Sequence, residues 1–134
     1  MVHLNNNNLN KRQLSDLFIQ LASTIAPKDS QRANDTLTEL LGTEERIMIA
    51  KRLAVVVLLV EGASQYKIGN LLKLSQSTIA HISEKLADGH YKVTLNNISK
   101  TKKDYFAFLN TLDSILHLGG ILPHYNGLDR YRSL

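Results

Sequence analysis

Residues 76–83 (QSTIAHIS) carry mostly short side chains that can form hydrogen bonds, apart from Ile79 and Ile82, which are spaced as on one face of a helix. The surrounding segment, residues 64–83 (SQYKIGNLLKLSQSTIAHIS), is typical of two short helices joined by a tight turn. Apolar residues at helical spacing give each helix a buried face. Six side chains of the second helix then point outward: Gln76, Ser77, Thr78, Ala80, His81 and Ser83. Such side chains can bond base edges and phosphates in the major groove, so the segment predicts a helix-turn-helix.

Individual positions within this segment agree with that interpretation. Ser75 is a good N-cap for the second helix, Gly69 is small where two helices would approach closely, and Leu74 is an apolar residue in the turn. Lys73 stands where the turn usually has glycine, and a left-handed lysine would cost on the order of 1 kcal/mol. This leaves two alternatives: a slightly different turn, or a Lys73 tolerated for its charge near phosphate. The alternative is an ordinary helical hairpin within a core that binds no ligand.

Positive charge is concentrated on and just after this hairpin. The whole chain of 134 residues has a formal net charge of +4. Residues 64–103 contain seven lysines and two acidic residues, Glu84 and Asp88, whereas residues 1–50 contain five basic and six acidic residues. This distribution favours phosphate contacts at the hairpin. A lysine-rich surface exposed only to water is the alternative.

The residue types that enzymes and metal sites require do not form a recognisable pattern. The chain has no cysteine, and its histidines (His3, His81, His90, His117 and His124) lack metal-ligand spacing. It also has no glycine-rich phosphate loop. We therefore predict no catalytic residues, no metal site and no enzymatic activity.

The N-terminus shows no signal peptide, and the most apolar stretch, residues 53–60, is too short to span a bilayer. The sequence predicts a cytoplasmic protein without a membrane-spanning segment.

The remaining chain predicts a single all-α domain over residues 11–118. Helices are expected at residues 11–25, about 30–41, 44–61 and 99–118, in addition to the two helices of the hairpin. Thr43 is the expected N-cap of the third helix, and residues 90–95 (HYKVTL) suggest a loop or a small strand. Residues 1–10 are Asn-rich and predict a disordered arm, and residues 119–134 form a C-terminal tail.

The expected third helix contains a run that is apolar on every side, residues 53–60 (LAVVVLLV). A helix that is apolar all round must be buried all round, and a chain of this length has few elements with which to surround it. The pattern therefore suggests that a second copy of the chain covers it.

Residues 40–85 resemble the Trp repressor family. The resemblance depends on Leu40, Leu41, Glu45 and Arg46 in the pattern LL-x-x-x-ER, on Arg52 in the apolar helix, on Gly62 at its end, and on Ser64, Gln65 and Asn70 in the hairpin. It implies an all-α, six-helix, intertwined homodimer with a helix-turn-helix. Such a dimer would bind a palindromic operator in double-stranded DNA and repress transcription.

The resemblance also implies positions for DNA contact. It adds Gln65, Tyr66 and Gly69 to the outward residues Gln76, Ser77, Thr78, Ala80 and His81, and the charge pattern adds Lys67 and Lys73 as phosphate contacts. The family often carries basic side chains at the positions of Tyr66 and Gly69, so the operator need not be the same.

The resemblance further implies a small-molecule effector, which in the best-known family members is L-tryptophan. Its indole lies between two arginines; the first is matched by Arg52 and the second falls on His81. The family's Thr position falls on Gly42, beside Thr43, and a Ser position falls on Lys85. The sequence thus establishes no cofactor, and it suggests an effector pocket at Leu41, Gly42, Thr43, Arg52, His81 and Lys85 for L-tryptophan or another small molecule.

A second function class has the same fold. A helical dimer could use the hairpin to bind another protein, as an adaptor module without DNA binding. A steep dependence of DNA affinity on salt would favour the regulator, because counterion release accompanies phosphate contacts.

Overall fold

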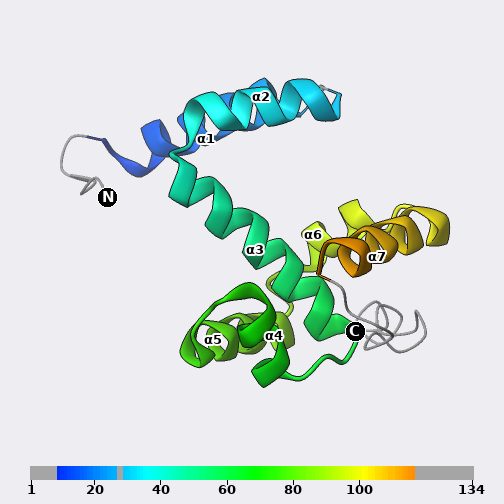
Figure 1. The fold of residues 1–134 in the computed structure, drawn as a ribbon. Helices are drawn as coiled ribbons and strands as arrows, with labels where there is room; N and C mark the ends of the chain where they lie inside the picture. The colour runs from blue at the N-terminus through cyan, green and yellow to red at the C-terminus, as the bar shows by residue number, and fades with distance from the viewer. Residues whose placement is uncertain (1–8, 27–28, 117–134) are drawn as a thin grey trace. The chain divides into compact units, whose positions relative to one another are not determined.

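The computed structural model describes residues 9–26 and 29–116, and this part of the chain contains seven α-helices and no strand (Figure 1). The helices are α1 (Lys11–Ile25), α2 (Ser30–Leu40), α3 (Thr43–Val60), α4 (Gln65–Leu72), α5 (Gln76–Ala87), α6 (Lys92–Ile98) and α7 (Lys102–Leu116). The chain divides into two compact units, one up to Ile47 and the other from Met48. The prediction of an all-α fold is confirmed.

The first unit contains α1 and α2, and each helix begins at a side-chain cap. Asn10 and Gln13 form a reciprocal capping box: the Asn10 Oδ1 accepts from the Gln13 amide at 2.8 Å, and the Gln13 Oε1 accepts from the Asn10 amide at 2.9 Å. Asp29 caps α2 by accepting from the amide of Arg32 at 2.8 Å. No residue of α1 or α2 is buried, although α1 carries an apolar stripe.

The start of α3 differs from the expectation that Thr43 would cap it. Thr43 is the first helical residue, and the amide of Arg46 donates to the carbonyl of Gly42. The Glu45 carboxylate accepts from the Gly42 amide at 2.9 Å, so it satisfies the donor that precedes the helix. The acidic side chains Glu44 and Glu45 also favour the positive end of the helix dipole.

The second unit is built around the C-terminal half of α3. Val55, Val56, Val57, Leu58 and Val60 are 0–1% exposed, as the apolar run predicts. However, residues of α4 to α7 in the same chain complete this core: Ile68, Leu72, Ile79, Ile82, Leu86, Leu95, Tyr105, Leu109 and Leu112. The run is therefore buried within a single chain, so it does not need the second copy that the sequence suggested.

The segment after α5 contains the main corrections to the expected elements. The residues expected to form a loop or strand include the start of α6, so six helices were predicted where the described part contains seven. Leu95 of α6 enters the core at 5% exposure, and this packing outweighs the strand preference of Val93 and Thr94. The last helix begins at Lys102, after Thr101 caps it by accepting from the Asp104 amide at 3.0 Å.

A buried polar contact joins α7 to the end of α3. The hydroxyl of Tyr105 donates to the Glu61 carboxylate at 2.5 Å, and both residues are at most 2% exposed. Tyr105, Leu109 and Leu112 form the buried face of α7, whereas Ile115 is 64% exposed. Ile115 lies in the last turn of α7, where the next residue, Leu116, packs against the core instead.

Three predicted features concern residues outside the described part of the chain. The N-terminal arm was placed at residues 1–10, of which residues 1–8 are not described; the last two residues of the predicted final helix and the tail 119–134 are also outside. The single domain at residues 11–118 remains a prediction.

In the described part of the chain, no helix combines the length and apolar character needed to cross a membrane.

Candidate nucleic-acid interface

The two helices of the hairpin begin at matching serine caps. Ser64 accepts from the amide of Lys67 at 3.2 Å, and Ser75 accepts from the amide of Thr78 at 3.2 Å. The Ser75 hydroxyl also lies 2.8 Å from the Thr78 hydroxyl and 3.2 Å from the Ser77 hydroxyl. These caps set where α4 and α5 start, and therefore which residues occupy their exposed first turns.

The turn between α4 and α5 places a lysine in the left-handed conformation. Lys73 has φ 57° and ψ 50°, and its amide donates to the carbonyl of Gly69. It is exposed, and no other residue except glycine has a positive φ in the described part of the chain. The turn therefore keeps the left-handed conformation and accepts Lys73 there.

Close contact between α4 and α5 accounts for Gly69. A Cβ atom at this position would lie 3.0 Å from the backbone carbonyl oxygen of Leu74. It would also collide with the side-chain amide nitrogen, Nε2, of Gln76. Gly69 is buried, so its role in the structure is to let the second helix approach. The side-chain amide group of Gln76 lies against Gly69, and this is its position before a ligand binds.

Most of the predicted DNA-contact residues lie on the surface. Gln65, Tyr66, Lys67, Lys73, Gln76, Ser77 and His81 are exposed, Thr78 and Ala80 are half-buried, and Gly69 is buried. Tyr66 is 69% exposed. Ile79, Ile82 and Leu86 are buried, so α5 presents its polar side to solvent as predicted.

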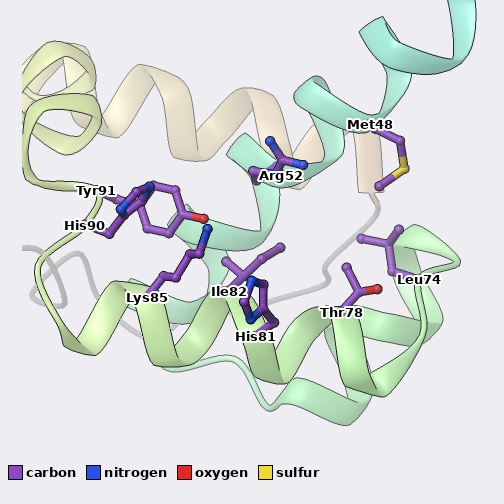
Figure 2. A pocket seen from close by; sticks show the side chains of 9 residues that line it. All are labelled: Met48, Arg52, Leu74, Thr78, His81, Ile82, Lys85, His90 and Tyr91. Carbon is purple, nitrogen blue, oxygen red and sulfur yellow. The ribbon is translucent and has the colours of Figure 1, made fainter. Parts of the chain in front are cut away.

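A pocket of about 240 Å³ lies between α3 and α5 (Figure 2). It is lined by Met48 and Arg52 of α3, by Leu74 of the turn, by Thr78, His81, Ile82 and Lys85 of α5, and by His90 and Tyr91, which follow α5. All nine residues belong to the second unit.

This pocket brings together three of the six residues of the predicted effector site. Arg52, His81 and Lys85 line it, whereas Leu41, Gly42 and Thr43 belong to the first unit. The structure adds His90 and Tyr91, which the sequence analysis missed. Their rings meet edge to face with centroids 4.9 Å apart.

Thr78 and His81 have a place in both candidate sites. Each was predicted to contact DNA, and each also lines the pocket on the flank of α5. Only their position in the folded chain shows this, because the sequence does not reveal which side of α5 faces α3. A molecule in the pocket would therefore contact α5 directly.

Among the described residues, His, Asp and Glu side chains nowhere form a group of three that could hold a metal ion.

Comparison with protein families supplies a match over most of the chain. The family model described as Trp repressor protein matches residues 12–111, which include all of α1 but its first residue, α2 to α6, and most of α7. Comparisons with curated proteins and with solved structures give no match. The matched family consists of DNA-binding regulators rather than enzymes, and the exposed polar face of α4 and α5 agrees with it. The chain therefore belongs to the Trp repressor family of helix-turn-helix regulators.

Proposed function

We propose that this protein is a sequence-specific transcriptional repressor that binds a palindromic operator as a homodimer, with α5 in the major groove. The observation that carries the proposal is the first turn of α5. There Gln76 and Ser77 are exposed next to a capped helix N-terminus whose opposite side is fully buried in the core. A rigid helix start with exposed hydrogen-bonding side chains is what direct readout of base edges requires.

Charge around this helix supports the same proposal. Lys67 in α4 and Lys73 in the turn are exposed, and neither makes an ion pair or a side-chain hydrogen bond within the described part of the chain. Lys67 lies in the first turn of α4 and Lys73 three residues before α5, and both are available for backbone phosphates. Their contribution would set the register of the protein on DNA and make affinity depend on salt.

The homodimer is supported by α1 rather than by the apolar run of α3. Leu17, Phe18, Ile19 and Leu21 of α1 are 45–64% exposed, and no α1 residue is buried. Contiguous exposed apolar side chains of this kind mark interaction surfaces. An isologous interface between two copies would cover them and would present two α5 helices to two operator half-sites, about 34 Å apart.

Selection of bound sequences from a random DNA pool tests the proposal, with and without L-tryptophan at moderate salt. We expect enrichment of a palindromic sequence, and affinity for it that falls steeply as salt is raised. A consensus without two-fold symmetry would contradict the dimeric operator. The absence of enrichment under both conditions, with protein partners captured instead, would favour the adaptor module.

A further inference from the structure

Gly69 is an unexpected residue for the middle of a helix. Glycine in a helix interior is destabilising relative to alanine, and α4 has only eight residues. The contacts of this position account for it. Two of the three atoms nearest to an added Cβ would belong to Gln76: its Nε2, which the Cβ would strike, and its Cδ at 3.4 Å. The space that glycine leaves open is therefore occupied by the side-chain carboxamide of Gln76.

The polar side chains at the start of α5 differ in what they bond. The hydroxyls of Ser75 and Thr78 lie 2.8 Å apart, and that of Ser77 lies 3.2 Å from the Ser75 hydroxyl. Gln76 is exposed, and its carboxamide makes no hydrogen bond within the described part of the chain. It therefore keeps its donors and its acceptor for a ligand, while packing against α4 holds it in place.

A glutamine held in this way is suited to reading a base. A long polar side chain loses conformational freedom when it binds, and one that is already packed in position loses less. A carboxamide presents a donor and an acceptor side by side. Among the four bases, only adenine offers the matching pair in the major groove, with N7 as acceptor and N6 as donor.

The other side chains of α5 agree with a preference for A·T pairs. Guanine is most often read by arginine or lysine, and residues 76–83 contain neither. Thr78 and Ala80 are half-buried on α5 and carry methyl groups, which suit contact with the methyl group of thymine. The surface of α5 therefore favours adenine and thymine over guanine.

We propose that Gln76 reads an adenine in each operator half-site, and that Gly69 positions its carboxamide for this contact. This inference rests on the proposed function and deepens it, because it states which base the first turn of α5 selects. Gly69 is buried, so it acts through Gln76 rather than by touching DNA. A substitution at Gly69 should therefore change base preference at one symmetric pair of positions in the operator, rather than weaken binding to every sequence.

Selection from a random DNA pool by the full chain, followed by titration of duplexes that differ at one symmetric pair of positions, tests the base assignment. At the position that depends on Gln76, the wild type should favour adenine about tenfold over the other bases. Gln76→Ala should lose this preference and keep those at other positions. Gln76→Glu has the same size but only accepts hydrogen bonds, so it should favour cytosine there, through the cytosine N4 donor.

Gly69→Ala tests the positioning. The added methyl group must displace the Gln76 carboxamide, so the preference for adenine should fall severalfold. In the Gln76→Ala background, the same change should have no further effect on base preference, because no carboxamide remains to be displaced. The variant should stay helical, since alanine favours a helix. Asn70→Ala, at an exposed neighbouring position of α4, is the control and should keep the wild-type preference.

A second variant repeats this test without altering α4. Gln76→Asn keeps the carboxamide but withdraws it by one methylene group, so it should also weaken the preference for adenine. Circular dichroism and the urea midpoint would show whether each variant is folded.

Three results would overturn this inference while the proposed function holds. They are a palindromic consensus with no position that depends on Gln76, a base other than adenine at that position, and a full preference for adenine in both Gly69→Ala and Gln76→Asn. Binding without any sequence preference would instead refute the proposed function, and this inference with it.

Discussion

Replacing Lys73 with glycine should make the protein more stable and a weaker DNA binder. Lys73 has φ 57° and ψ 50°, and this left-handed conformation costs a residue with a Cβ atom about 1–2 kcal/mol. Glycine removes that cost, but it adds about 0.5–1 kcal/mol of unfolded-chain entropy. The Lys73 side chain is exposed and makes no hydrogen bond, so little else is lost. The free energy of unfolding should rise by about 0.5–1 kcal/mol.

Urea unfolding followed by circular dichroism, at one fixed protein concentration, measures this change. Lys73→Arg keeps both the charge and the strain and should match the wild type, whereas Lys73→Asn should be intermediate, because asparagine tolerates the left-handed region. Gly89, with φ 82°, is the reverse case: a Cβ there would lie 2.9 Å from the Lys92 Cε, so Gly89→Ala should be destabilising. A lower unfolding free energy in Lys73→Gly than in the wild type would refute the strain argument.

The same variant tests whether the charge of Lys73 contributes to DNA binding. If its ammonium group neutralises one phosphate, Lys73→Gly and Lys73→Asn should each flatten the slope of log affinity against log salt by about 0.9, and Lys73→Arg should not. Stability and affinity would then change in opposite directions at a single residue. Identical slopes in all four proteins would show that Lys73 does not contact phosphate.

Three further variants test separate parts of the structure. Phe18→Glu should abolish the dimer in sedimentation experiments without loss of helicity, because Phe18 is 64% exposed in the single chain; a dimer that persists would contradict an interface at α1, and the neighbouring Gln20→Glu is the charge control. Gln76→Ala should lower specific operator affinity by about 1–3 kcal/mol while binding to random DNA is retained, and equal losses on both would refute base readout. Tyr105→Phe removes the donor to the buried Glu61 carboxylate and should reduce the free energy of unfolding by about 1–3 kcal/mol, and an unchanged urea midpoint would show that this contact contributes little.

The features that the sequence determined by itself depend on interactions between residues close in the chain. The caps at Asp29, Ser64 and Ser75 follow from side chains that bond amides three residues later. The buried faces of α4 and α5 follow from helical spacing of apolar residues. The same local logic identified Lys73 as the residue at the turn position that usually has glycine, and the family match could be anticipated from motifs within residues 40–85.

Other features were decided by the tertiary structure, because they depend on which elements meet. Residues 92–98 are helical because Leu95 packs into the core, and this packing outweighs the local preference for a strand. The apolar run of α3 is covered by α4 to α7 of the same chain, which counting elements in the sequence did not anticipate. The pocket joins Arg52, Lys85 and His90 from three separate segments, and its charge exists only once the chain has folded. Local spacing specifies a helix and its faces, but packing between distant segments decides what each face contacts.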